Sequence, residues 1–151
     1  QATFDDYCAA VKRPKPGVVP LLLVDAEAAV APTDTVWQHL KRRDNWDQPP
    51  DAQANTEFLM IQMMEHWFLA DPDALEKYFG QGFRRQAIRR WPNIEAVSKD
   101  DAMNALKQAT QACRKQYAKG NSSFEILALL NPLAVKTACP AAAALLGRLG
   151  A

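Results

Sequence analysis

Long apolar stretches, paired cysteines and a large net charge are all missing from this sequence of 151 residues. No apolar run approaches the roughly 20 residues that span a bilayer, and the first residues lack the pattern of a signal peptide, so we expect a cytoplasmic protein with no membrane partner. The three cysteines, Cys8, Cys113 and Cys139, are far apart and form no CxxC pair. This spacing argues against a disulfide framework and against a zinc site. The absence of a Walker-type glycine loop makes a nucleotide-binding or nucleotide-hydrolysing module the weakest functional alternative.

The composition that remains is typical of one globular domain. Hydrophobic residues make up 48% of the chain and charged residues 23%, with no low-complexity tract and no internal repeat. A chain of this length can bury one core but is too short for two comfortable domains. We therefore predict that residues 1–151 form a single domain.

The net charge of +1 hides an uneven distribution along the chain. Residues 1–75 contain 6 Lys and Arg against 12 Asp and Glu, whereas residues 76–151 contain 12 against 5. An acidic half that can hold a divalent cation and a basic half that can hold phosphate would suit a metal-dependent enzyme acting on nucleic acid or nucleotide. The alternative is that both surpluses are only solvated surface.

Two apolar runs in the first half of the chain predict strands of a buried, parallel sheet. One run covers residues 18–24, and the other covers residues 58–62 after a polar loop over residues 44–56. Helical spacing of apolar residues predicts a helix over residues 3–13 and a shorter one over residues 32–43.

From residue 63 onward the pattern is predominantly helical. Asp71 and Pro72 end one helix and begin the next, which Gly80 closes. Further helical segments are predicted over residues 84–90, 100–116 and 122–130, with two turns after Pro132 and Pro140. Two strands are too few for a stable sheet. Because Gln1 is not an initiator methionine and a helix already opens at residue 3, we expect that an upstream first strand is lacking.

Three acidic residues are the candidates for a metal site. Glu65 interrupts the apolar run from Met63 to Pro72, and a buried carboxylate needs a cation, a donor or an opening to water. Asp25 and Glu27 follow the first predicted strand, where alternation would place both side chains on one side. Such oxygen ligands suit Mg²⁺. The alternatives stay open: Glu65 as a structural carboxylate that caps a backbone or pairs with an arginine, and Asp25 and Glu27 as helix-cap or loop acids.

Two further features could bind phosphate. Lys119 and Gly120 precede a predicted helix, whose free N–H groups attract anions. The alternative is a plain loop in which Asn121 or Ser122 caps the helix. Four arginines recur at helical spacing and could follow a nucleic-acid backbone, or could form a solvated face: Arg84, Arg85, Arg89 and Arg90.

The neighbours of Glu65 are predicted to be structural. His66 fits a surface or hydrogen-bonded histidine better than a site residue. Trp67 and Phe68 have the spacing of a buried helix face. Asp71, placed before Pro72, fits a helix cap.

Three strings of the sequence resemble a bacterial family of unknown function. That family is related to the TOPRIM domains of topoisomerases, primases and overcoming-lysogenization-defect nucleases, and is often encoded beside an ABC-type ATPase. The resemblance covers residues 4–140, and Glu-X-Trp-Phe-Leu-Ala-Asp is its specific part. The strings are Leu21-Leu22-Leu23-Val24-Asp25-Ala26-Glu27, Glu65-His66-Trp67-Phe68-Leu69-Ala70-Asp71-Pro72-Asp73-Ala74-Leu75, and Tyr117-Ala118-Lys119-Gly120 with Ser123-Phe124-Glu125-Ile126-Leu127.

The resemblance implies a TOPRIM-like α/β fold, with a small, mostly parallel central sheet flanked by helices, a helix-rich C-terminal half and a metal site at the C-terminal ends of the strands. In TOPRIM-like sites an acid on the first strand works with an Asp-X-Asp pair on a later one. Asp25 and Glu27 would be that later pair, with glutamate replacing the second aspartate. The first-strand acid has no counterpart, which matches the lacking upstream strand.

The function expected from the residues and the resemblance together is nuclease-like. We expect Mg²⁺-dependent or Mn²⁺-dependent cleavage of phosphodiesters in nucleic acid, in phage defence with an ATPase partner. Asp25, Glu27 and Glu65 would hold the metal, and Glu65 and Lys119 would be catalytic. The alternative is a non-catalytic interaction or regulatory subunit of an ATPase complex.

Overall fold

The acidic first half of the chain forms the sheet and two of the helices next to it. The computed structural model describes residues 1–150, except for the side chain of Asn121. Both predicted helices and both predicted strands of this half are present, and each strand is shorter than predicted. In chain order the elements are α1 (Ala2–Lys12), β1 (Leu22–Asp25), α2 (Val36–Asp44) and β2 (Glu57–Met60).

Local sequence explains where these elements begin. Thr35 starts α2 through a capping box: its hydroxyl accepts the Gln38 N–H at 3.2 Å, and the Gln38 side chain accepts the Thr35 N–H at 2.8 Å. The first half of the predicted run over residues 18–24 is not strand, because Val18 and Val19 are 54% and 39% exposed and pair with no neighbouring strand in the described chain.

The second half of the described chain is entirely helical apart from its connections. The elements are α3 (Glu65–Ala70), α4 (Pro72–Phe79), the 3-10 turns η1 (Arg85–Ala87) and η2 (Ile94–Ala96), α5 (Lys99–Thr110), α6 (Asn121–Leu127), α7 (Pro132–Ala138) and α8 (Pro140–Arg148). The fold is thus a helix-rich α/β arrangement, as predicted.

The two strands pair in parallel, as predicted for buried apolar runs. Leu22 lies opposite Glu57, and Asp25 lies opposite Met60. The pairing continues one step beyond the strands, where the Ala26 N–H donates to the Met60 carbonyl at 2.8 Å. Because the strands are parallel, both C-terminal ends lie at the same edge of the sheet.

The sheet separates two hydrophobic cores. Alternate strand residues belong to opposite cores: Phe58 packs with the helices of the second half, whereas Leu59 packs with α1 and α2. In β1, Leu22 lies in the core that contains α1 and α2, and Leu23 packs against the core formed with the helices of the second half. A sheet covered on both faces explains why β1 reads as a continuous apolar run rather than an alternating one.

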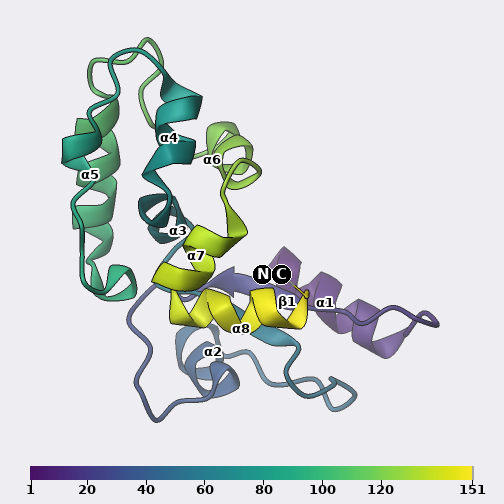
Figure 1. Ribbon diagram of the computed structural model, residues 1–151. Helices are drawn as coiled ribbons and strands as arrows, with labels where there is room; N and C mark the ends of the chain where they lie inside the picture. Colours follow the sequence, from purple (N-terminus) through teal and green to yellow (C-terminus); the bar gives the residue numbers. More distant parts are fainter. Residues whose placement is uncertain (151) are drawn as a thin grey trace.

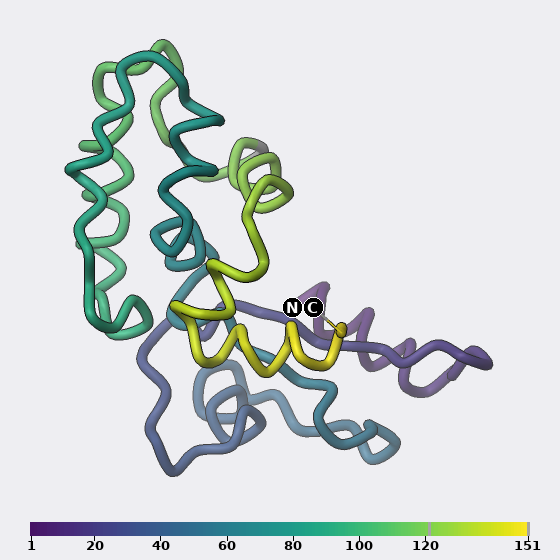
Figure 2. Tube along the Cα trace, viewed as in Figure 1, coloured from purple at the N-terminus to yellow at the C-terminus, as the bar shows by residue number. Residues whose placement is uncertain are grey.

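The arrangement in space follows from these two cores. The helices α3, α4 and α5 form a lobe that extends away from the sheet (Figure 1). After α6 the chain returns through α7 to α8, which lies against β2 (Figure 2). Within residues 1–150 no helix has the length and apolar character that a membrane span requires.

Two predicted helices are corrected by the structure. The segment 84–90 contains only the 3-10 turn η1. Arg84, which precedes this turn, donates its N–H to the Ala109 carbonyl at 2.8 Å. The helix predicted to reach residue 116 ends at Thr110. There the Thr110 hydroxyl donates back to the Leu106 carbonyl and accepts the Tyr117 N–H, both at 2.9 Å, which turns the chain.

Candidate acidic site at the sheet edge

Asp25 is the last residue of β1, at the edge where both strands end. Its Oδ1 accepts the Met64 N–H at 2.8 Å, and its backbone carbonyl accepts a hydrogen bond from the Arg43 guanidinium. No other described residue donates to its second carboxylate oxygen. Burial raises the pKa of the half-buried Asp25 carboxyl, the Met64 N–H opposes this shift, and the negative charges of Glu27 and Glu65 raise the pKa further.

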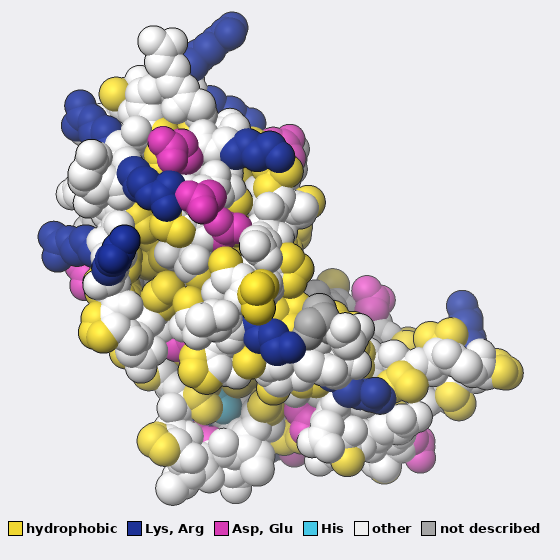
Figure 3. All heavy atoms as spheres, viewed as in Figure 1, with side chains coloured by type: hydrophobic (Ala, Val, Ile, Leu, Met, Phe, Trp, Pro, Cys, Tyr) yellow, Lys and Arg dark blue, Asp and Glu magenta, His cyan; other side chains and the backbone are white. Residues whose placement is uncertain are grey.

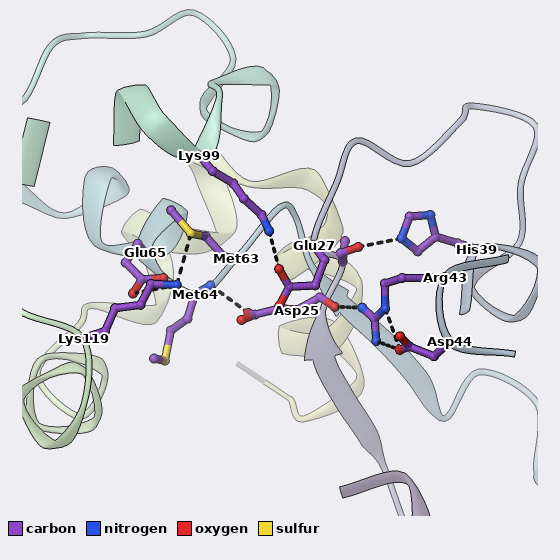
Figure 4. A network of polar contacts seen from close by, with 11 residues as sticks. Asp25, Glu27, His39, Arg43, Asp44, Met63, Met64, Glu65, Lys99 and Lys119 are labelled. Atoms are coloured by element: carbon purple, nitrogen blue, oxygen red, sulfur yellow. Dashed lines mark hydrogen bonds and ion pairs between the residues drawn. The ribbon is translucent and has the colours of Figure 1, made fainter. Parts of the chain in front are cut away.

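Glu27 lies beyond the strand and points elsewhere. Its φ of 62° is in the left-handed region, and its N–H donates to the Gln62 carbonyl at 2.7 Å. The carboxylate forms an ion pair with Lys99, the first residue of α5. Figure 4 shows the Asp25 carboxylate directed toward Met64 and the Glu27 carboxylate directed toward Lys99. The rule of alternation does not apply to Glu27, because its backbone has left the extended conformation.

Glu65 is the first residue of α3 and is only 2% exposed. Its Oε1 accepts a hydrogen bond of 2.6 Å from the Tyr117 hydroxyl, which also lies 3.1 Å from the Ser123 hydroxyl. Burial and the hydrogen bond to Glu65 both raise the pKa of Tyr117, so the phenol stays protonated and remains a donor. Glu65 therefore has the partner that its position in an apolar run requires.

Lys119, in the loop before α6, approaches the same carboxylate. Its Nζ lies 3.8 Å from Glu65 Oε1 and 3.7 Å from the Met63 sulfur, while its side chain is 58% exposed. Gly120 is the N-cap of α6, with a φ of 131°. The predicted cap was Asn121 or Ser122, but the Ser122 hydroxyl donates backward to the Ala118 carbonyl at 2.8 Å. Lys119 thus faces the acidic site rather than a helix N-terminus (Figure 4).

The three predicted metal ligands do not converge into one ligand set. Within residues 1–150, no group of three His, Cys, Asp or Glu side chains lies close enough to hold a metal ion. Glu27 is paired with Lys99, and Glu65 is paired with Tyr117 and Lys119. A three-carboxylate site therefore does not fit this conformation. A Mg²⁺ ion held by one carboxylate, several waters and substrate phosphate would fit Asp25, because that mode needs few protein ligands.

The residues near Glu65 that were predicted to be structural have structural roles in the fold. Trp67 and Phe68 are buried. The fully buried His66 has its Nε2 at 2.8 Å from the Val97 carbonyl, which is the hydrogen-bonded alternative. Asp71 caps α4 by accepting the Ala74 N–H at 3.1 Å. The other oxygen of Asp71 accepts the N–H of Asn131, which precedes α7, at 2.8 Å.

Three residues of the site were not predicted. Tyr117 lies in one of the resembling strings, but it is 52 positions from Glu65, and no periodicity relates the two. Ser123 is buried beside it and also lies in a resembling string. Lys99 carries no sequence signal that would have linked it to Glu27, which is 72 positions away.

The fold and these contacts define a helix-rich α/β domain with an acidic sheet edge. Comparison with known families then identifies the chain: residues 4–150 match the family described as "Domain of unknown function (DUF4276)", and the chain belongs to that family. The prediction of a domain-of-unknown-function family is confirmed. No curated protein and no solved structure gives a significant match.

Proposed function

We propose that the chain is a TOPRIM-like domain that cleaves phosphodiesters in nucleic acid with the help of Mg²⁺ or Mn²⁺. The observation that carries this proposal is the meeting of Asp25, Glu65 and Lys119 at the carboxyl edge of a parallel sheet. These residues come from three distant parts of the chain, and the Glu65 and Lys119 charges both act on the Asp25 carboxyl. Ligands of α/β sheets generally bind outside the carboxyl ends of the strands.

In this proposal Asp25 holds a hydrated cation through its second oxygen. When bound, the ion would polarise the phosphoryl group and activate water. Asp25 is suited to this task because burial and two neighbouring acids make its own negative charge unfavourable without a cation. The remaining ligand positions of the ion would be filled by water and substrate phosphate.

Lys119 would bind the substrate phosphate, and Glu65 would position Lys119. The exposed side chain of Lys119 leaves its ammonium accessible to a phosphate, while the 3.8 Å separation from Glu65 Oε1 limits where the ammonium can go. The Tyr117 hydroxyl fixes the Glu65 carboxylate in turn. This assignment changes the expected role of Glu65 from metal ligand to positioning residue.

A cleavage assay tests the proposal. Labelled single-stranded DNA, single-stranded RNA and duplex DNA would be incubated with the protein and Mg²⁺ or Mn²⁺, with EDTA as the blank. We expect Asp25→Asn and Lys119→Ala to lower the cleavage rate more than about tenfold. Asp6→Asn is the matched control, because Asp6 is exposed on α1. An Asp25→Asn protein that cleaves at the wild-type rate would contradict the assignment of Asp25.

The second candidate is a non-catalytic subunit of an ATPase complex. Two observations favour it: Glu27 and Glu65 already have partners within the chain, and the segment 124–133 exposes large apolar side chains. Phe124 and Leu133 are each 67% exposed, and Leu129 is 41% exposed. Exposed apolar side chains of this size are typical of contacts with another protein. A role in phage defence belongs to either candidate and rests on the resemblance alone.

The two candidates differ in a direct experiment. If the chain is a binding subunit, it will co-purify with an ABC-type ATPase encoded beside it, and Phe124→Ser with Leu133→Ser will abolish the association. Val18→Ser is the matched control, because Val18 is also exposed and apolar but lies in the connection between α1 and β1. Under this candidate, the wild-type chain cleaves no nucleic acid with any divalent cation.

A further inference from the structure

A hollow of about 510 Å³ lies at the end of α3 that is opposite Glu65. Its volume is typical of small-ligand sites. Residues at the end of α3 and the start of α4 form one wall, and the chain from η1 to η2 forms the other. The residues that line it are Leu69, Ala70, Pro72, Arg85, Gln86, Ile88, Arg89, Arg90, Trp91 and Ile94.

Two arginines of this hollow keep an uncompensated charge. Arg85 is neutralised by ion pairs with Asp73 and with Glu76, the latter at 3.0 Å. Arg89 and Arg90 are exposed, and neither has a hydrogen bond, ion pair or ring contact with another described residue. Most of the visible Lys and Arg side chains lie on the lobe of α3, α4 and α5, with acidic and apolar side chains between them (Figure 3). The hollow is therefore suited to an anion.

Trp91 adds an aromatic surface to the same hollow. It is half-buried, whereas the other tryptophans, Trp37, Trp46 and Trp67, are buried. Buried Ile88 and Ile94 on either side of Trp91 provide an apolar floor. A phosphate alone would make no favourable contact with these apolar side chains. A ligand that carries both a phosphate and a flat ring would use every part of the hollow.

We infer that this hollow binds a segment of single-stranded nucleic acid, with phosphates at Arg89 and Arg90 and an unpaired base against Trp91. Base stacking on an aromatic side chain and phosphate contacts from arginine are the two terms that bind single strands without sequence preference. A duplex keeps its bases stacked on each other, so it would gain only the phosphate contacts. The inference rests on the proposed function for the choice of nucleic acid, and it adds the strandedness of the substrate.

Binding is measured by fluorescence anisotropy of a labelled oligothymidylate of about ten nucleotides, with the full chain, at low salt and in EDTA. The EDTA separates binding from cleavage, so the result does not depend on the acidic site. We expect Arg89→Ala with Arg90→Ala to weaken binding more than about tenfold and to reduce the slope of log affinity against log salt by about 1.4. Arg13→Ala with Lys15→Ala, an exposed pair beyond α1, should change affinity by less than about twofold.

The contribution of Trp91 is tested separately. Trp91→Ala should weaken binding by about 5-fold to 160-fold, whereas Trp91→Phe keeps a stacking face and should bind within about threefold of wild type. Tryptophan fluorescence should be quenched by the oligonucleotide in the wild type and not in Trp91→Phe. Trp91→Phe retains an apolar ring at this position, so it is the control for a folding defect in Trp91→Ala.

Several results would overturn the inference. They are equal affinity of the arginine variant and its control, equal binding of a duplex and a single strand, unchanged quenching in Trp91→Phe, or tight binding of thymidine monophosphate but not of the strand. Loss of the proposed function would look different. In that case Asp25→Asn would cleave like the wild type, or nothing would cleave, while strand binding at the hollow stayed intact.

Discussion

The hydrogen bond between Tyr117 and Glu65 gives the sharpest test of the candidate site. Tyr117→Phe removes only the hydroxyl that donates to Glu65 Oε1 at 2.6 Å. The ring and its edge-on contact with Phe68, 6.2 Å between centroids, would remain. Water cannot easily replace the lost donor, because Glu65 is 2% exposed. The variant thus removes the bond to the buried carboxylate, together with the 3.1 Å contact between the Tyr117 and Ser123 hydroxyls.

The expected cost follows from that burial. A hydrogen bond to a charged group contributes about 1.5–3 kcal/mol, and a buried acceptor left without its donor loses close to the full amount. Lys119 remains 3.8 Å from the same oxygen and compensates for part of the loss. We therefore expect Tyr117→Phe to lower the free energy of unfolding by about 2 kcal/mol at neutral pH.

Urea denaturation followed by circular dichroism measures this change. A loss of about 2 kcal/mol corresponds to a midpoint lower by about 1 M. In a double-mutant cycle, Tyr117→Phe should cost much less when Glu65→Gln is already present, since the charged acceptor is gone. Tyr78→Phe is the matched control, because the Tyr78 hydroxyl also donates to a carboxylate, that of the exposed Glu125.

We expect no measurable loss from the control. The reasoning would be refuted if Tyr117→Phe cost no more than Tyr78→Phe, or if its cost were the same with and without the Glu65 charge.

Three further predictions use the same measurement. Burial raises the pKa of Asp25, so the folded state favours the protonated carboxyl and loses stability as the pH rises above the unfolded pKa of about 3.9. Asp25→Asn should therefore be more stable than wild type at neutral pH. Below about pH 3.9 the two proteins should be equally stable. Asp71→Ala removes both carboxylate oxygens that accept backbone N–H groups and should cost about 2 kcal/mol, whereas Asp71→Asn should cost less. Gly82→Ala should cost more than about 2 kcal/mol, because a Cβ there would overlap the Ala112 carbonyl oxygen. Gly80→Ala should cost less, because its Cβ would meet no neighbouring atom and only the positive φ opposes the side chain. Equal losses for the two glycine variants would show that the close approach is unimportant.

Local signals explain what the sequence could predict. Asp71 followed by Pro72 combines a cap with the residue that tolerates the first helical turn, and α4 begins there. A continuous apolar run such as that of β1 predicts a strand covered on both faces, and two cores cover the sheet. Each of these features is decided by residues within a few positions of one another.

The candidate site depends on features of a different kind. No local pattern indicates that Glu27 adopts a positive φ, which is uncommon for a residue with a side chain of this size. The pairing of Glu65 with Tyr117 and of Glu27 with Lys99 depends on how α3, α5 and the loop before α6 pack together. Tertiary packing settles those contacts, so the sequence could nominate the acids but could not predict their partners.

Lys99 and Lys119 would couple cation binding to phosphate binding at the sheet edge, which a purely acidic site would not do. Lys99 and Lys119 compensate two of the three carboxylates, which leaves about one uncompensated negative charge, that of Asp25. A phosphate that attracts Lys119 would weaken its hold on Glu65, and the negative field at Asp25 would then grow. A cation bound at Asp25 would in turn favour the approaching phosphate. Within the proposed function, cation and nucleic acid would therefore increase each other's affinity by the same factor, as linkage requires.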